Sequence, residues 1–155
     1  MEVEHVFLRI DHVGIAVHDL EEKIEFFAKT FDLTVVAREV NEEQGVKEAM
    51  LRIRDGNYIQ LLEPLTPDSP VGRFLARRGE GVHHVAFGVR DVEETMERVG
   101  ARGVRLLDER PRHGSMGSSI AFLHPKDVTG VLTELVQSDH PGQPLFHGNN
   151  DSPAG

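Results

Sequence analysis

Two stretches of the chain carry the same alternation of hydrophobic and polar positions, 72 residues apart. The first, DHVGIAVHDLEE, begins at Asp11, and the second, HHVAFGVRDVEE, begins at His83. Because apolar residues with bulky side chains occupy every second position, each stretch predicts a β-strand with one bulky face. The opposite face of the first strand carries His12, Gly14 and Ala16. The second strand repeats this arrangement, which indicates an internally duplicated protein.

Each predicted strand leads into an aspartate that is followed three residues later by a glutamate. These aspartates, Asp19 and Asp91, suit helix N-caps, since their side chains can accept hydrogen bonds from the free N–H groups of a first turn. Apolar residues then recur at helical spacing. We expect the first helix to end near Phe31 and the second at Gly100 or Gly103, because glycine suits a helix C-terminal cap.

Three further strand-like runs follow each helix. They are LTVVAREV, KEAMLRI and NYIQLLEP in the first copy, and VRLLDE, SSIAFLHP and GVLTELVQ in the second. The repeating unit is therefore βαβββ, over about residues 8–65 and 80–137. We predict an α+β fold in which these tandem modules form a single domain, residues 1–137, and enclose a cleft. Residues 138–155 are rich in Pro, Gly, Asn and Asp, and we expect them to form a flexible tail.

Composition and charge narrow the classes of function. The formal net charge of the 155 residues is −9, which argues against binding to nucleic acid or to a membrane surface but does not forbid an anionic small molecule. The absence of cysteine excludes disulfides and thiolate metal sites. No run approaches the roughly 18 apolar residues of a membrane span, and the N-terminal residues are acidic where a signal peptide would be basic. We therefore expect a cytoplasmic protein.

Four polar side chains occupy equivalent positions in the two modules, on the first and the last strand of each. They are His12, Gln60, His84 and Glu134. Two imidazoles with oxygen ligands suit divalent Co, Mn, Fe, Ni or Zn. Each histidine could instead begin a strand near solvent and bind nothing. The duplication favours a metal-containing cleft, as does Glu134 within an apolar run, since a buried carboxylate needs a partner or a metal.

The paired βαβββ modules with DHVGIAV, GVHHVAF and a terminal LTELVQ resemble the vicinal oxygen chelate, or glyoxalase-like, superfamily. Within it, the strings EEQGVKEAML, LLEPLTPDSPVGRFLARRGEGVHHVAF and FLHPKDVTGVLTELVQ are similar to the methylmalonyl-CoA epimerase family. The resemblance implies a homodimer that interconverts the (2R) and (2S) epimers of methylmalonyl-CoA. It also implies a divalent metal, often cobalt, whose ligands match His12, Gln60, His84 and Glu134.

Glu48, in GVKEAML, matches an acidic residue proposed as a catalytic base in some members of that family. The implied reaction removes a proton from the carbon between a thioester and a carboxylate, and returns a proton to the opposite face. Glu48 shares strand parity with Met50, so we expect it to face the cleft; a surface position is the alternative. The second module has Ser119 or Ile120 at the corresponding place. Glu134, a bound water or another group must then serve the second face.

An acyl-CoA carries several negative charges, which an acidic protein must balance with a local basic patch. We expect Lys126, near the mouth of the cleft, to contact the substrate. The arginines of VGRFLARRG could do the same or form a solvated helix face. The loop HGSMGSS could close over substrate or serve as a flexible connection. His83 should point away from the cleft, because side chains alternate along a strand.

Other functions remain open on this scaffold. An extradiol-type dioxygenase would use His12, His84 and Glu134 as an iron site with two histidines and one carboxylate, although Gln60 would then fill a position that oxygen and a diol need. A glyoxalase-like isomerase usually has a glutamate in place of Gln60. A non-enzymatic ligand-sequestering module would line its groove with aromatics, whereas the chain has no Trp and one Tyr. Ethylmalonyl-CoA or another 2-substituted malonyl thioester would also fit the same chemistry.

Overall fold

The computed structural model describes residues 4–138, so the expected tail lies outside the described residues apart from Ser138. The strands are β1 (Arg9–Ala16), β2 (Thr34–Asn41), β3 (Val46–Ile53), β4 (Asn57–Pro64), β5 (Gly81–Gly88), β6 (Arg112–His113), β7 (Ser119–Leu123) and β8 (Thr133–Gln137). The helices are α1 (Leu20–Phe31), α2 (Pro70–Arg78) and α3 (Val92–Ala101), with 3-10 turns η1 (Arg54–Gly56), η2 (Ser115–Gly117) and η3 (Pro125–Asp127). Among the residues from 4 to 138, no helix is long and apolar enough to cross a bilayer.

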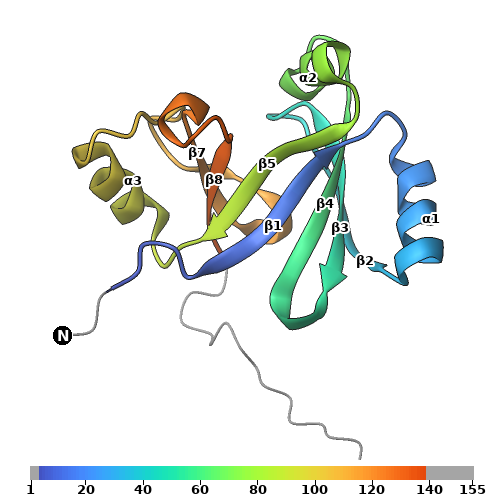
Figure 1. Cartoon of the computed structure of the whole chain (residues 1–155), viewed down its shortest axis with the longest axis horizontal. Coiled ribbons are helices and arrows are strands. Elements are labelled where there is room, and N and C mark those ends of the chain that lie inside the picture. Colours follow the sequence, from blue (N-terminus) through green and yellow to red (C-terminus); the bar gives the residue numbers. More distant parts are fainter. Residues whose placement is uncertain (1–3, 139–155) are drawn as a thin grey trace, which may run out of the picture.

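All eight strands form one curled sheet, in the order β2-β3-β4-β1-β5-β8-β7-β6 (Figure 1). The first strand of each module pairs in parallel with the last, β1 with β4 and β5 with β8. The two first strands then pair with each other, antiparallel, at the centre. The sheet is therefore symmetric about the β1–β5 junction, which confirms the predicted α+β fold of two βαβββ modules.

The helices of the two modules begin as their sequences predict. Asp19 accepts a hydrogen bond from the N–H of Glu22 at 3.0 Å, and Asp91 accepts one from Glu94 at 2.9 Å. Helix α1 ends at Phe31, whereas α3 runs through Gly100 and ends two residues before Gly103, which has a positive φ of 92°. Each helix packs its apolar side on the outer face of its own half of the sheet. The cleft lies on the opposite, inner face.

Two features differ from the expected modules. The run VRLLDE forms no strand, because only Leu106 bridges to Leu123, and the Asp108 carboxylate accepts the backbone N–H of Phe122 at 2.8 Å. This side chain replaces the backbone acceptor that a continuing strand would supply, and the short β6 forms four residues later instead. Between the modules lies α2, a helix outside both repeats, which is capped by Ser69 at 3.1 Å from the N–H of Gly72.

Candidate metal centre and active site

Six polar side chains are buried on the inner face of the sheet. They are Asp11, His12, Glu48, Gln60, His84 and Glu134, each with 6% or less of its surface exposed. Burying so many polar and ionisable groups lowers the stability of a small domain unless they are paired or bind a ligand. Their gathering in one place therefore indicates a functional site.

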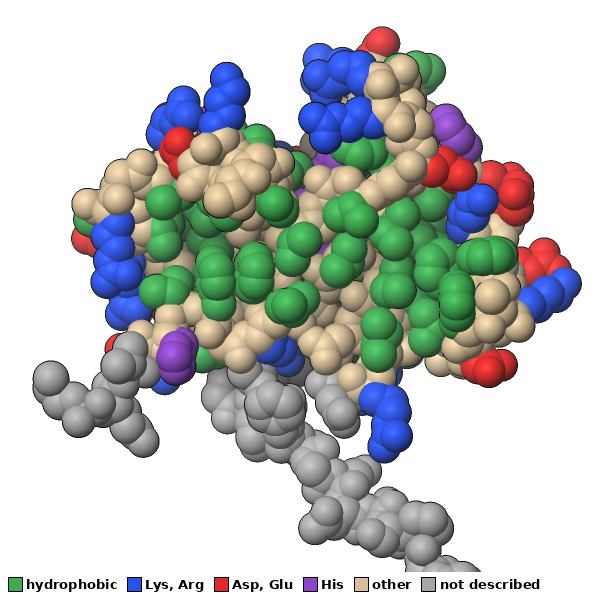
Figure 2. All heavy atoms as spheres, viewed as in Figure 1, with side chains coloured by type: hydrophobic (Ala, Val, Ile, Leu, Met, Phe, Trp, Pro, Cys, Tyr) green, Lys and Arg blue, Asp and Glu red, His purple; other side chains and the backbone are tan. Residues whose placement is uncertain are grey.

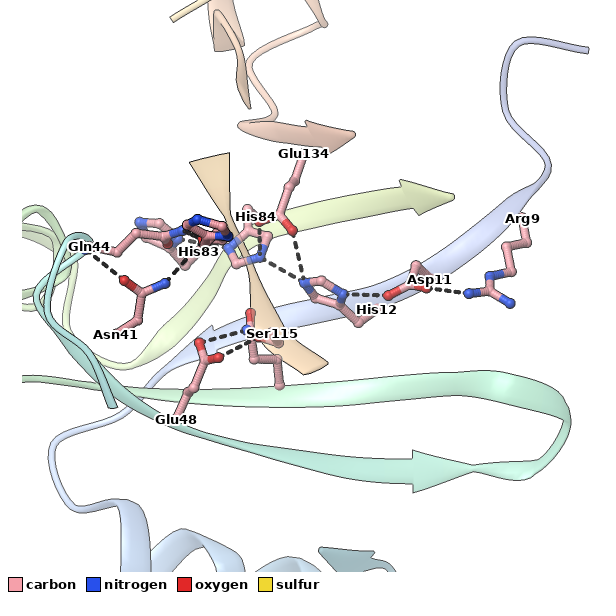
Figure 3. A network of polar contacts seen from close by, with 12 residues as sticks. Arg9, Asp11, His12, Asn41, Gln44, Glu48, His83, His84, Ser115 and Glu134 are labelled. Atoms are coloured by element: carbon pink, nitrogen blue, oxygen red, sulfur yellow. Dashed lines mark hydrogen bonds and ion pairs between the residues drawn. The ribbon is translucent and has the colours of Figure 1, made fainter. Parts of the chain in front are cut away.

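His12, His84 and Glu134 converge on one point from three central strands (Figure 3). The Nε2 atoms of the two histidines are 3.1 Å apart. The Glu134 carboxylate places Oε1 3.7 Å from His12 Nε2 and Oε2 3.3 Å from His84 Nε2. Ligand atoms that share one ion with bonds of about 2.1 Å lie about 3 Å apart when the bonds are perpendicular. The spacing therefore fits three ligands of a single ion.

The strand register explains how the two modules place their polar side chains equivalently. In the first module, Gly14 of β1 pairs with Gln60 of β4. In the second, Ala86 of β5 pairs with Glu134 of β8. Gly14 and Ala86 each lie two positions after a buried histidine, so Gln60 and Glu134 occupy matching places on the inner face.

A β-bulge lies immediately before each of these histidines. The register of the β1–β5 pair shifts twice, which leaves Asp11 as an extra residue on β1, before His12, and His83 as an extra residue on β5, before His84. A bulge interrupts the alternation of side chains along a strand and re-aims the extra residue. Asp11 and His83 thereby reach the histidines that follow them.

Asp11 holds the ring of His12. Its Oδ2 accepts a hydrogen bond from Nδ1 of His12 at 2.8 Å, while its Oδ1 accepts one from Arg9 at 2.6 Å. Because a carboxylate can only accept, the ring proton must sit on Nδ1 and leave the Nε2 lone pair directed at the cluster. Carboxylate support of this kind fixes the orientation of a ligating imidazole and raises its basicity.

His83 supports His84 in the corresponding way. The two Nδ1 atoms are 2.9 Å apart, and the His83 ring packs edge-to-face on Phe74 of α2. If His84 offers its Nε2 lone pair to an ion, its Nδ1–H donates to Nδ1 of His83. The prediction that His83 points away from the cleft is wrong, because the bulge breaks the alternation on which it rested.

Gly14 gives the His84 ring its space. A Cβ atom at position 14 would lie 2.2 Å from Cε1 of His84. No real structure tolerates such a contact, so any larger residue would displace the ring. The glycine of DHVGIAV is therefore required by the close approach of an imidazole from the neighbouring strand.

Glu48, Gln60 and Ser115 form a second polar group next to the histidines. The Gln60 amide nitrogen donates to Oε2 of Glu48 at 2.9 Å and to Oγ of Ser115 at 2.8 Å, and the Ser115 hydroxyl donates to Oε1 of Glu48. Ser115 belongs to η2, in the loop HGSMGSS of the second module. The N–H of Met116 in the same turn contacts both carboxylate oxygens of Glu39 at 3.1 Å. The loop thus bridges the two modules over the site.

Burial favours the neutral forms of Glu48, Glu134 and His84, whereas the pKa of His12 is raised, because the hydrogen bond to Asp11 and the charge of Glu134 outweigh its burial. Burial raises the pKa of Glu48 to about 7, against the opposing hydrogen bond from Ser115. Burial likewise raises the pKa of Glu134 to about 7, and it holds the pKa of His84 well below its usual range. An uncharged His84 keeps a nitrogen lone pair available for coordination near neutral pH.

The buried groups fit a divalent ion. Within residues 4–138, Oε1 of Gln60 is one of three buried side-chain polar atoms without a hydrogen-bond partner, although both hydrogens of its amide are used. An amide oxygen, a carboxylate and two imidazoles are a donor set for first-row transition metals. A cation would also offset the cost of burying the Glu134 carboxylate.

A family model agrees with this architecture. The Glyoxalase/Bleomycin resistance protein/Dioxygenase superfamily matches residues 11–122. The chain belongs to this superfamily. The match begins at the first bulge and ends in β7, so it spans both modules.

Several relatives with known names are methylmalonyl-CoA epimerases. A variant of the methylmalonyl-CoA epimerase of Streptomyces coelicolor, solved with 2-nitronate-propionyl-CoA, is 55% identical with a TM-score of 0.84, over 86% of this chain and 99% of that one. A methylmalonyl-CoA epimerase solved with methylmalonyl-CoA and NH4+ is also 55% identical, with a TM-score of 0.86, over 89% and 99%. The ethylmalonyl-CoA/methylmalonyl-CoA epimerase of Cereibacter sphaeroides is 35% identical over 83% of this chain and 97% of its own. The chain thus belongs to the epimerase family within the superfamily.

Lys126, the residue predicted to contact the substrate, lies apart from the buried cluster. Lys126 is exposed in η3, where its backbone N–H donates to Nδ1 of His124 at 3.2 Å. Its neighbour Pro125 lines a groove that also reaches His84. The structure therefore brings together five predicted residues and leaves Lys126 near the rim of that groove. The five are His12, Glu48, Gln60, His84 and Glu134.

Sequence reasoning missed three residues of this superfamily site, namely Asp11, His83 and Ser115. The first two precede the ligand-type histidines in both copies of the repeat, which was a usable signal. Strict strand alternation nevertheless placed His83 on the wrong face, and it suggested no role for Asp11. Ser115 carried no comparable signal, because a serine in a glycine-rich loop is common and its contact with Glu48 joins two distant modules.

Proposed function

We propose that this enzyme is a metal-dependent epimerase that interconverts (2R)- and (2S)-methylmalonyl-CoA. The observation that carries the proposal is the position of Glu48, a buried carboxyl group hydrogen-bonded to Gln60 beside the His12, His84 and Glu134 cluster. A base next to a metal centre is what removal of a weakly acidic proton requires. The two named epimerases at 55% identity support the same reaction.

His12, Gln60, His84 and Glu134 would hold a divalent metal ion, for which we propose cobalt. When bound, such an ion supplies a positive charge that stabilises the negative charge developing on a thioester oxygen. The protein prepares the ligands beforehand, because Asp11 and His83 fix the ring orientations of the two histidines. These four side chains would hold the ion from the protein side, and substrate oxygens would complete its coordination.

Glu48 is proposed to take the proton from the carbon between the thioester and the carboxylate. Ser115 and Gln60 each donate to one of its oxygens, which sets the orientation of the carboxyl group. A pKa of about 7, raised by burial, lets it accept and return a proton near neutral pH. The side chain of Glu134 lies on the other side of the histidines (Figure 3). We propose it as the group that serves the opposite face of the planar intermediate.

We also propose a homodimer. A band of hydrophobic side chains crosses the outer face of β1 and β5, between α1 and α3 (Figure 2). Ile10 and Val82 on these strands are 53% and 57% exposed. A continuous apolar surface of this kind is typical of protein–protein contacts.

Light scattering tests the dimer. It should give twice the mass of the 17.3 kDa chain for the wild type, and the mass of one chain for an Ile10→Asp variant. A wild-type mass of one chain would contradict this.

Proton NMR of (2R)-methylmalonyl-CoA in D₂O tests the reaction. We expect the Cα proton signal to disappear rapidly with cobalt-loaded protein, and at the rate of a protein-free control after treatment with a chelator. Metal-loaded protein that exchanges no faster than the control would contradict epimerisation. Dioxygenase or glyoxalase substrates would then be tried on the same preparation, and protein that binds no metal would indicate a ligand-binding module.

A further inference from the structure

The loop 114–118, between β6 and β7, is held against the first module by side chains from two neighbouring strands. Ser115 of this loop donates to Glu48 of β3, which is the proposed base. The backbone N–H of the next residue, Met116, lies 3.1 Å from each carboxylate oxygen of Glu39 on β2. Figure 3 shows Ser115 and Glu48 facing each other from the two modules. The tip of the loop is therefore attached to the first module at two consecutive residues.

The backbone of Met116 has a left-handed conformation. Its φ of 55° and ψ of 39° fall in a region that residues with a Cβ atom rarely occupy, because the side chain crowds the backbone there. Such a conformation persists where surrounding contacts hold it, and it is common at functional sites. The Met116 side chain is 42% exposed, so its own packing is too slight to fix the turn. The hydrogen bond from its N–H to Glu39 supplies a contact that does.

Glu39 also lies opposite Glu48. The two residues are directly paired across β2 and β3, so their side chains lie on the same face of the sheet. Like charges at directly paired positions repel, so this pairing is unfavourable unless donors reach the two carboxyl groups. The loop supplies both donors, the N–H of Met116 to Glu39 and the hydroxyl of Ser115 to Glu48. A glutamate at position 39 is thus explained by its contact with the loop.

We infer that Glu39 is a positioning residue, which binds the N–H of Met116 and thereby keeps the hydroxyl of Ser115 against Glu48. The inference rests on the proposed function, in which Glu48 transfers the proton. Ser115 and Met116 share one planar peptide unit, so release of the Met116 N–H lets Ser115 move away from Glu48. Glu39 therefore acts through the loop, and it neither binds the metal nor transfers the proton.

Amide hydrogen exchange, followed by NMR on protein loaded with diamagnetic zinc, tests the contact without depending on the reaction. The Met116 N–H should be protected in the wild type. Glu39→Ala should raise its exchange rate about tenfold or more, because the hydrogen bond that protects it is lost. Glu39→Gln keeps an acceptor oxygen and should retain most of the protection. Glu43→Ala, at an exposed glutamate between β2 and β3, is the control and should leave the rate unchanged.

Steady-state kinetics with methylmalonyl-CoA test what the contact does. We expect Glu39→Ala to lower kcat about tenfold with KM within about twofold, because a displaced Ser115 affects the chemical step rather than binding. Glu39→Gln should restore most of the rate. Ser115→Ala protein has no hydroxyl to position, so adding Glu39→Ala to it should lower kcat no further. A loss of equal size in both backgrounds would mean that Glu39 acts on Glu48 directly or through stability, and would overturn the inference.

The two measurements separate this inference from the proposed function. Met116 exchange that depends on Glu39, in a protein that epimerises no thioester, would keep the contact with the loop and overturn the proposed function. An active enzyme whose Glu39→Ala variant releases the Met116 N–H at full kcat would keep the function and overturn the positioning role. Met116 exchange that is the same in Glu39→Ala and wild type would also overturn it.

Discussion

The two modules share one strand order but support their histidines differently. In the first, His12 contacts Asp11, an ionised carboxylate that is itself paired with Arg9. In the second, His84 contacts His83, a neutral ring whose pKa burial lowers to about 4. What the duplication has kept is the β-bulge before each histidine. The bulge delivers a side chain to Nδ1, and the chemistry of that side chain is free to differ between the halves.

The proposed acid–base chemistry is also divided unequally. Glu48 pairs with Leu62 across β3 and β4, and Ile120 holds the corresponding place opposite Val136. Ile120 is buried with 1% of its surface exposed, so the second module offers no twin of Glu48. Instead it sends Ser115 to contact Glu48. One half thus provides the proposed base, and the other holds its carboxyl group in place.

Among the predicted substitutions, removal of the Glu48 carboxylate, which has no counterpart in the second module, should have the largest effect on activity. We expect Glu48→Gln to slow exchange of the Cα proton about 10²-fold to 10⁴-fold, the usual range for loss of a general base. Cobalt affinity should stay the same, because Glu48 is not a proposed ligand. NMR exchange rates and calorimetric cobalt titration measure the two quantities. Glu42→Gln, an exposed glutamate between β2 and β3, is the control. A variant that exchanges as fast as wild type would remove Glu48 from the mechanism.

The two small residues on the inner face should respond unequally. Gly14→Ala places a Cβ 2.2 Å from the His84 ring, which must move. We expect cobalt affinity to fall about 100-fold, which is at the upper end of the losses caused by mutating residues that position metal ligands. Its counterpart Ala86→Gly removes a methyl group and should lower stability by about 1 kcal/mol without changing affinity. Equal affinity in both variants would show that the ring has space the structure does not reveal.

Much of the fold could be predicted because it depends on local rules. The alternation from Asp11 and from His83, the caps Asp19 and Asp91, and the offset between copies are properties of the sequence itself. They determine two βαβββ modules, and strand parity alone puts Glu48 on the inner face. The repeat likewise named His12, Gln60, His84 and Glu134, whereas Glu48 was singled out by the resemblance to the epimerase family.

The remainder depends on contacts between strands that no local pattern encodes. A bulge is a mismatch of register between β1 and β5, so neither strand alone reveals it. The run VRLLDE has strand-like composition but forms no strand. The Asp108 carboxylate accepts the N–H of Phe122 in place of a backbone carbonyl. Ser115 and Glu48 are 67 residues apart and meet only when the modules close.

Neutralising Asp11, which holds the ring of His12, should lower cobalt affinity less than displacing the His84 ring does. Asp11→Asn keeps a hydrogen-bond acceptor for Nδ1 of His12 but loses the charge that raises the basicity of the ring. We expect cobalt affinity to fall about tenfold, at the low end for such supporting residues. Asp91→Asn, which keeps its N-cap role on α3, is the matched control. Chelator competition measures both. Unchanged affinity in Asp11→Asn would mean that orientation alone matters.

Removing His83, the neutral ring that contacts His84, should lower cobalt affinity least, because other contacts also hold the His84 ring. Its ring lies against Gly14 and packs edge-to-face on Phe122, with centroids 5.7 Å apart. We expect His83→Leu to lower cobalt affinity about threefold, roughly the value of one neutral hydrogen bond. His83→Gln, which offers an amide oxygen to Nδ1, should restore most of it. If His83→Leu instead loses as much as Asp11→Asn, the charge on Asp11 carries no special weight, and the two bulges support their histidines equally.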